Sequence, residues 1–257
     1  MKAVILAGGF GTRISEETHL KPKPMIEIGG KPILWHIMKI FSHYNVNEFI
    51  ICCGYKGYII KEYFANYFLH MSDVTFDMAK NEMKVHHQNV APWTVTLLDT
   101  GENTMTGGRL KLVYPFIKNE KSFYFTYGDG LSDVNLDELL KFHNISGKKA
   151  TMTGVLQPGR YGAIISEENL VTSFVEKPQG QNGLINGGFF VLSPSVVKYI
   201  EDENTPWETK PLQMLVEDKE LVVFNHYGFW HPMDTLRDKN YLENLWLSKN
   251  SPWKLWK

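Results

Sequence analysis

Cysteine is scarce in this sequence, and neither charge is in excess. The only two cysteines, Cys52 and Cys53, are adjacent, so on a strand their side chains would point to opposite faces. This excludes a disulfide framework and a cysteine zinc site, and we expect both residues to be packed in the interior. With a net charge of −1 we expect neither a polynucleotide nor an anionic membrane as a partner, because both are bound by clustered Lys and Arg.

Long apolar runs are also missing. No stretch approaches the roughly 20 apolar residues that a helix needs to cross a bilayer. Glycines and Arg13 interrupt the N-terminal run long before a signal sequence would be complete, and we therefore expect a cytoplasmic protein. What is present, 43% hydrophobic and 21% charged residues in a chain of 257, is typical of a folded globular protein with a large core.

Strand-like and helix-like segments alternate along the chain. This succession predicts an α/β fold with a Rossmann-like mixed, mainly parallel sheet flanked by helices. Period-two segments over residues 72–98 predict an inserted β-hairpin, and residues 235–257 predict a C-terminal helix and tail. No linker or repeat divides the chain, so we expect a single domain over residues 1–257. The main predicted strands cover residues 3–9, 48–55, 122–130 and 150–156, and the main predicted helices cover residues 31–44, 58–71, 135–145 and 234–249.

The first predicted strand runs directly into a glycine-rich loop. The three glycines of residues 8–11 lack side chains, so their backbone N–H groups can approach a polyphosphate. Further on, Lys23 stands between two prolines, which we expect to hold the backbone extended and to aim the ammonium group. A second glycine pair precedes Arg109 at the start of a predicted helix, where N-terminal N–H groups favour anions. The glycine spacing fits neither a P-loop nor a dinucleotide fingerprint, which argues against a nicotinamide dehydrogenase.

The segment LAGGFGTR (residues 6–13), together with KPKPM (residues 21–25), resembles the signature of the sugar-1-phosphate nucleotidyltransferases. The resemblance implies a GT-A-like fold in which the loop wraps the nucleotide, while the arginine and the lysine contact its triphosphate. Residues 14–20 depart from most of the family and are similar to the branch that joins CTP to glucose 1-phosphate. The resemblance further implies a homo-oligomer, for which a hexamer is one candidate, and the supply of CDP-glucose for deoxysugars of a bacterial surface polysaccharide such as a lipopolysaccharide O-antigen.

The resemblance also assigns roles to particular residues of this chain. It places Arg13, Lys23 and Asp129 in catalysis. The residues implied in nucleotide binding are Leu6, Ala7, Gly8, Gly9, Gly11, Thr12, Arg13, Lys23, Thr104, Arg109 and Gly128. The residues implied on the sugar-phosphate side are Tyr127, Glu176, Lys177, Asn186, Gly187 and Gly188.

A magnesium site is expected at the end of the predicted strand 122–130. Asp129 stands there, at the edge where open α/β sheets bind ligands, and carboxylates suit Mg²⁺. The resemblance pairs Asp129 with Asp234, which also follows a short predicted strand. From local sequence alone, an aspartate between two glycines is equally typical of a turn.

These residue types fit a phosphate nucleophile. The phosphate of a sugar 1-phosphate has a second pKa of about 6, so at neutral pH it is mostly dianionic and needs no general base. The barrier is repulsion between anions, about 4 kcal/mol for each pair of unit charges about 4 Å apart at an effective dielectric of about 20. Cations and Mg²⁺ offset it, so we expect in-line attack on the α-phosphorus of CTP without a covalent intermediate.

Two other functions stay open at this point. A uridylyl- or thymidylyltransferase acting on a hexose 1-phosphate would use the same phosphate-binding residues, and residues 14–20 would then decide the base. A non-catalytic nucleotide sensor would keep the fold but tolerate loss of the carboxylates. Asp129 and Asp234 are both present, which favours an enzyme.

Overall fold

The computed structural model describes residues 1–257 except 89, 157–162, 168–169, 176–182 and 257. For residues 13, 15, 16, 70, 87, 88, 163–167 and 170–175 it describes the backbone only.

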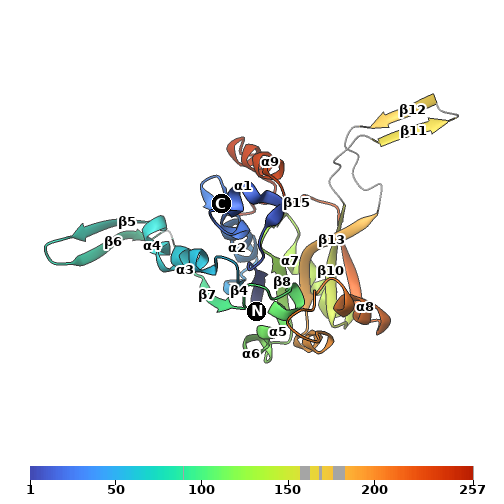
Figure 1. The fold of residues 1–257 in the computed structure, drawn as a ribbon, viewed down its shortest axis with the longest axis horizontal. Helices are drawn as coiled ribbons and strands as arrows, with labels where there is room; N and C mark the ends of the chain where they lie inside the picture. Colours follow the sequence, from blue (N-terminus) through green and yellow to red (C-terminus); the bar gives the residue numbers. More distant parts are fainter. Residues whose placement is uncertain (89, 157–162, 168–169, 176–182, 257) are drawn as a thin grey trace.

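A mixed, mainly parallel sheet of seven strands forms the centre of the molecule, in the order β14-β10-β13-β8-β1-β4-β7 (Figure 1). These strands are β1 (Lys2–Leu6), β4 (Glu48–Cys53), β7 (Thr94–Asp99), β8 (Phe123–Tyr127), β10 (Ala150–Leu156), β13 (Leu184–Leu192) and β14 (Leu221–His226). Strand β13 pairs antiparallel with β8 and β10, and the other pairings within the sheet are parallel. The predicted fold class is confirmed.

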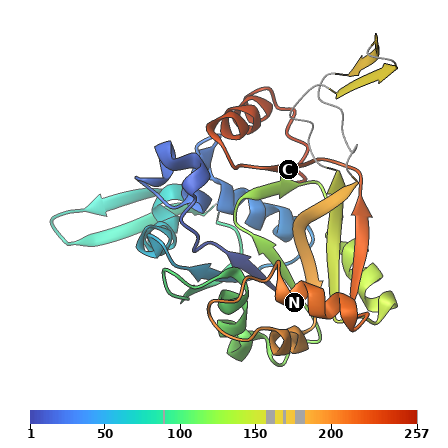
Figure 2. The ribbon, with the colours of Figure 1, turned by 45° about the vertical axis from the view of Figure 1, so that its right-hand side comes forward.

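Helices cover both faces of this sheet (Figure 2). The helices are α1 (Ser15–Thr18), α2 (Ile33–His43), α3 (Gly57–Ala65), α4 (Tyr67–Met71), α5 (Thr106–Leu112), α6 (Tyr114–Ile117), α7 (Leu136–Ser146), α8 (Lys210–Glu217) and α9 (Leu236–Leu247), and the 3-10 turns are η1 (Thr12–Ile14), η2 (Lys23–Met25) and η3 (Pro194–Tyr199). One buried cluster packs α2, α7 and α9 on one face, and a second packs α5, η3 and α8 on the other. Cys53 belongs to the first cluster and Cys52 to the second, as their adjacency on a strand predicts. Among the described residues, no helix combines the length and the apolar composition that crossing a bilayer requires.

Short two-stranded ladders surround the central sheet. Within the described part of the chain they are β2 (Glu27–Ile28) with β3 (Lys31–Pro32), β5 (Ser72–Asp77) with β6 (Glu82–Gln88), β9 (Gly130–Ser132) with β15 (Trp230–Pro232), and β11 (Ala163–Glu167) with β12 (Leu170–Val175). Strands β5 and β6 form a hairpin that extends away from the sheet (Figures 1 and 2). The predicted inserted hairpin is therefore present, but its predicted end at residue 98 was wrong.

The error concerns β7, which pairs in parallel with β4 at the edge of the central sheet. Its alternation of polar and apolar residues over residues 94–97 reflects the face on which Val95 and Leu97 pack against the first core cluster. On the other face, among the described residues of β7, only Leu98 packs against the second cluster. A half-covered edge strand and a hairpin strand show the same period of two, so periodicity alone did not separate them.

The C-terminal tail folds back onto the first core cluster and contacts α2. Trp253 is fully buried, and its indole Nε1 donates to Nδ1 of His36 at 3.3 Å. The other ring nitrogen of His36 lies 2.8 Å from the carbonyl oxygen of Ile28, so it carries the proton of the neutral ring. Both ring nitrogens are thus satisfied only while the imidazole is uncharged.

This arrangement predicts a loss of stability in acid. Burial lowers the pKa of His36 from 6.5 to about 4. As the pH falls, the unfolded chain therefore binds this proton before the folded protein does. The contribution of the neutral imidazole to the free energy of unfolding is complete above pH 6.5 and is lost as the pH falls toward 4. The free energy lost is about 3 kcal/mol. Denaturant unfolding over this range measures it. His36→Gln should flatten this part of the profile, while replacement of the exposed His43 by Gln should leave it unchanged; an equal slope in His36→Gln would contradict the assignment.

Candidate active site

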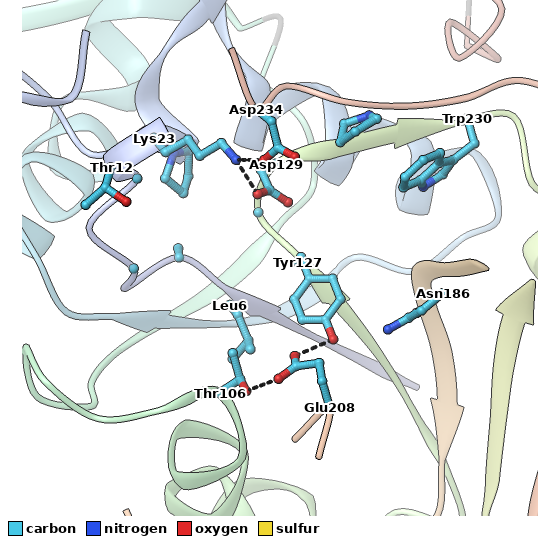
Figure 3. Close-up of a pocket in the computed structure, with 16 residues that line it drawn as sticks. Leu6, Thr12, Lys23, Thr106, Tyr127, Asp129, Asn186, Glu208, Trp230 and Asp234 are labelled. Carbon is cyan, nitrogen blue, oxygen red and sulfur yellow. Dashed lines mark hydrogen bonds and ion pairs between the residues drawn. The ribbon is translucent and has the colours of Figure 1, made fainter. Parts of the chain in front are cut away.

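A cavity of about 590 Å³ lies at the carboxyl ends of β1 and β8 (Figure 3). Open α/β sheets bind ligands at this edge, and the volume is in the range of small-molecule sites. The cavity is lined by Leu6, Ala7, Gly9, Gly11, Thr12, Lys23, Pro24, Thr106, Tyr127, Gly128, Asp129, Asn186, Glu208, Trp230, Pro232 and Asp234. A pocket of about 40 Å³ adjoins it and includes Gly187 and Gly188. Most of the predicted site residues therefore meet in one place.

The three glycines of the loop after β1 differ in the reason why the structure has glycine at each position. A Cβ atom on Gly8 would lie 2.1 Å from a guanidinium nitrogen of Arg109, so the packing of the fold requires glycine there. Gly11 has a φ of +64°, which glycine adopts without strain. A Cβ atom on Gly9 would meet nothing within 4 Å, and Gly9 lines the cavity. Of the three, Gly9 leaves open space that a ligand can use.

Lys23 is held by a short turn rather than by an extended segment. Pro22 is extended, with φ −65° and ψ 149°, but Lys23, Pro24 and Met25 form the 3-10 turn η2. The expectation of an extended backbone around Lys23 was therefore wrong after the first proline. Pro24 fits the turn because a proline near the start of a helix loses no hydrogen bond. The result still fixes the side chain, since Lys23 is only 8% exposed.

The ammonium group of Lys23 lies between two carboxylates (Figure 3). Its Nζ atom is 2.6 Å from Oδ2 of Asp129 and 2.7 Å from Oδ1 of Asp234. Burial alone would lower the pKa of Lys23, but the two carboxylates outweigh it and raise the pKa above its ordinary value. The lysine is therefore charged at neutral pH.

The two aspartates are neighbours because β9 and β15 pair. Gly130 of β9 lies opposite Pro232 of β15, and the backbone N–H of Met233 donates to the carbonyl oxygen of Asp129 at 2.8 Å. Asp234 then precedes α9, where Thr235 and Asp238 form a capping box. A ladder between residues about a hundred positions apart thus brings the predicted metal ligands together.

The donor set fits a magnesium ion. Both carboxylates reach one cation, the Lys23 ammonium group, so the same oxygen atoms could be shared by a metal ion in its place. Mg²⁺ is usually bound by one or two carboxylates, with water and substrate phosphates completing its coordination. The described residues contain no cluster of three or more His, Cys, Asp or Glu side chains arranged for a metal.

Arg109 lies beside the cavity and not on its wall. Its guanidinium group donates to the oxygen atoms of Gly8, Cys53, Thr100, Gly101 and Glu102, at 2.6 to 3.2 Å. These contacts join the glycine loop to the ends of β4 and β7. In this structure both terminal nitrogens donate to the protein, and we expect a positioning role. The predicted contact of Arg109 with the nucleotide stays a prediction.

Loss of this network should destabilise the fold. Arg109→Met keeps an apolar stem but leaves buried carbonyl oxygens without a charged donor, and we expect the free energy of unfolding to fall by about 3–5 kcal/mol. Denaturant unfolding measures this change. Lys118→Met, an exposed position near α6, is the control and should change stability by less than about 0.5 kcal/mol. Equal stabilities for Arg109→Met and the control would contradict the role.

The start of α5 is covered by another part of the chain. The amide groups of Met105 and Gly108 donate to the carbonyl oxygens of Glu203 and Thr205, at 2.9 and 3.2 Å. A Cβ atom on Gly107 would lie 2.5 Å from the oxygen of Thr205, so the glycines permit this close packing. Two of the N–H groups at this helix start are therefore used within the protein, and the expectation that the helix start favours an anion stays a prediction.

The remaining predicted residues divide into three groups. Tyr127 and Asn186 line the cavity, whereas Thr104 precedes α5 and does not. Gly188 has a φ of +76°, and a Cβ atom there would lie 2.6 Å from the ring of Tyr127. Glu176 and Lys177 lie outside the described residues, as does the side chain of Arg13. Their predicted roles stay predictions.

Sequence reasoning missed several residues of the cavity wall: Pro24, Thr106, Glu208, Trp230 and Pro232. Pro24 and Thr106 are close to predicted residues in the sequence, so their segments were already identified. Trp230 donates from Nε1 to the carbonyl oxygen of Gly187 at 2.7 Å, and Glu208 accepts from Tyr127 and Thr106. These contacts join distant segments, and no local pattern indicated them.

Comparisons with known proteins agree with this geometry. A family model described as nucleotidyl transferase matches residues 2–238, and the chain belongs to this family. It is 61% identical to the glucose-1-phosphate cytidylyltransferase of Salmonella typhi, over 100% of both chains. It is 32% identical to the mannose-1-phosphate guanyltransferase of Debaryomyces hansenii, over 99% of this chain and 68% of that protein. The predicted resemblance is confirmed.

The fold also agrees with a solved structure. The crystal structure of HddC from Yersinia pseudotuberculosis complexed with GMP-PN aligns with a TM-score of 0.69 at 23% identity. The alignment covers 95% of this chain and 99% of that chain.

Proposed function

We propose that this protein transfers a cytidylyl group from CTP to α-D-glucose 1-phosphate, which gives CDP-glucose and pyrophosphate. One structural observation carries the reaction class: Lys23, Asp129 and Asp234 meet on the wall of a cavity at the end of the glycine loop. The choice of CTP and glucose 1-phosphate rests on the relative from Salmonella typhi, whose name states both.

The family generally uses a divalent metal ion, and we propose Mg²⁺, held by Asp129 and Asp234. When bound, it would neutralise phosphate charge and orient the α-phosphate. Lys23 would then turn from the carboxylates to the triphosphate, and Gly9 leaves room for phosphate oxygens beside the backbone. The sugar phosphate attacks without a general base, since it is already dianionic. The protein thus acts through position and charge, without a covalent intermediate.

Release of pyrophosphate tests this proposal. The protein is incubated with Mg²⁺, glucose 1-phosphate and one of CTP, UTP or dTTP, and CTP should give the highest kcat/KM. A higher kcat/KM with UTP or dTTP would show that the protein is a uridylyl- or thymidylyltransferase. Release of pyrophosphate with none of the three nucleotides would favour a non-catalytic nucleotide sensor. Incubation with labelled CTP alone should leave the protein unlabelled; a trapped nucleotidylated protein would refute the mechanism.

We propose in addition that the protein is a homo-oligomer. The β5–β6 hairpin extends from the body and exposes Phe76, Met78 and Met83, of which Met78 is 86% exposed. A two-stranded hairpin is marginal by itself, and clustered apolar side chains usually contact a partner. Sedimentation should show an oligomer, with a hexamer as one candidate, and a monomer would contradict the proposal. A cytoplasmic location and a role in deoxysugar supply stay predictions.

A further inference from the structure

Glu208 is a carboxylate on the cavity wall to which the phosphate chemistry gives no role. Its Oε1 atom accepts a hydrogen bond from the hydroxyl of Tyr127 and its Oε2 atom accepts one from the hydroxyl of Thr106, both at 2.6 Å (Figure 3). The side chain nevertheless remains exposed toward the cavity. Each carboxylate oxygen has a second lone pair, so Glu208 can accept further hydrogen bonds from a ligand.

The residues that precede Glu208 anchor it to the core of the protein. The preceding residue, Trp207, is fully buried, and its backbone N–H donates to the same Thr106 hydroxyl at 2.8 Å. Its ring packs against Phe125 and Phe190 of the second core cluster. Backbone atoms of residues 203–207 also lie directly against the glycine pair of α5. Glu208 is therefore a pre-positioned acceptor and not a mobile surface side chain.

Charge decides which part of a substrate can lie beside Glu208. A carboxylate repels phosphate, by about 4 kcal/mol per pair of unit charges about 4 Å apart at an effective dielectric of about 20. The phosphates should therefore lie toward Lys23, and Figure 3 shows Glu208 at the other side of the cavity with Tyr127 between them. The hydroxyl groups of a sugar ring are uncharged donors, and two neighbouring ones can use both carboxylate oxygens.

We propose that Glu208 accepts hydrogen bonds from the hydroxyl groups of a substrate sugar ring and selects hydroxylated substrates over deoxy analogues. The ring is the ribose of the nucleotide or the hexose of the sugar phosphate, which offer the same chemistry. This inference rests on the proposed nucleotidyl transfer and adds a residue that determines its specificity.

Paired deoxy analogues test the inference. The kcat/KM of the wild type and of Glu208→Ala is measured with CTP against its 2′-deoxy and 3′-deoxy forms, and with glucose 1-phosphate against its 2-, 3-, 4- and 6-deoxy forms. The wild type should prefer the hydroxylated member of at least one pair by about 10- to 100-fold, since a hydrogen bond to a charged group is lost. Glu208→Ala should reduce that preference to within about threefold of unity. Deoxynucleotides identify the ribose as the partner, and deoxyhexoses identify the hexose.

The ratio of kcat/KM for a hydroxylated substrate to kcat/KM for its deoxy analogue separates recognition from damage to the fold, because a loss of folded protein lowers both values equally. If Glu208→Ala is too slow to measure, Glu208→Gln serves instead and should reduce the preference at least threefold. Glu203→Ala, in the same segment but off the cavity wall, is the control and should keep the wild-type preference. An unchanged preference in the Glu208 variants, or a change only between CTP and UTP, would overturn the inference. Failure of the wild type with every nucleotide would instead contradict the proposed function.

Discussion

Replacement of Lys23 by alanine is expected to lower turnover by about two to three orders of magnitude, as for loss of one charge-stabilising group. Lys23 is the cation that contacts both predicted metal ligands, and its side chain is buried at the cavity wall. Pyrophosphate release at saturating Mg²⁺ and substrates measures the effect. Near-normal turnover would show that this lysine does not act on the phosphates.

Lys21→Ala is the matched control for this variant. Lys21 lies two residues earlier and pairs with Glu27 at the surface, at 2.8 Å. Exposed ion pairs contribute little, so we expect near wild-type activity and stability. A loss of activity in both variants would point to the local loop and not to the charge of Lys23.

Lys23→Ala should also bind Mg²⁺ more tightly than the wild type in the absence of nucleotide. In the wild type the ammonium group occupies the position between Asp129 and Asp234 and competes with a metal ion. Because a ligand that binds only the folded state stabilises it, Mg²⁺ should raise the melting temperature of Lys23→Ala more than that of the wild type. Equal shifts would mean that the ion binds elsewhere.

Replacement of Asp129 by alanine is expected to lower turnover by about two to three orders of magnitude as well. The physical reason differs from that of Lys23: the variant retains the cation for the phosphates but loses one of two carboxylates that can hold Mg²⁺. The Mg²⁺ concentration that gives half-maximal rate should therefore rise. Titration of pyrophosphate release with Mg²⁺ measures both quantities.

Asp137→Ala provides the comparison for Asp129→Ala. Asp137 lies in the first turn of α7, where a carboxylate contributes only about 0.3–1 kcal/mol through the helix dipole. Its turnover and Mg²⁺ dependence should match those of the wild type. If Asp129→Ala kept the same Mg²⁺ dependence, Asp129 would not be a metal ligand.

Several features of the site followed from the sequence because their causes are local. A buried strand that runs into glycines predicts a ligand loop at the edge of a sheet, and Gly9 and Asp129 are found there. The same holds for Cys52 and Cys53, whose adjacency on β4 sends them to opposite faces. Local pattern also misled where two structures share one pattern, as for β7, whose alternation fits a hairpin and an edge strand equally well.

The fold class, the glycine loop and the residue types expected to bind phosphate and metal could be predicted from the sequence, because each prediction depends on short-range periodicity or on the chemistry of single side chains. Only the tertiary structure decided which of these residues meet. Pairing of β9 with β15 brings Asp129 to Asp234, and packing of residues 203–207 on the glycines of α5 places the next residue, Glu208, on the cavity wall. The tertiary structure also shows that Arg109 joins the glycine loop to the ends of β4 and β7, because its guanidinium group donates to oxygen atoms of these segments. Such contacts join segments far apart in the chain, and no local pattern specifies them.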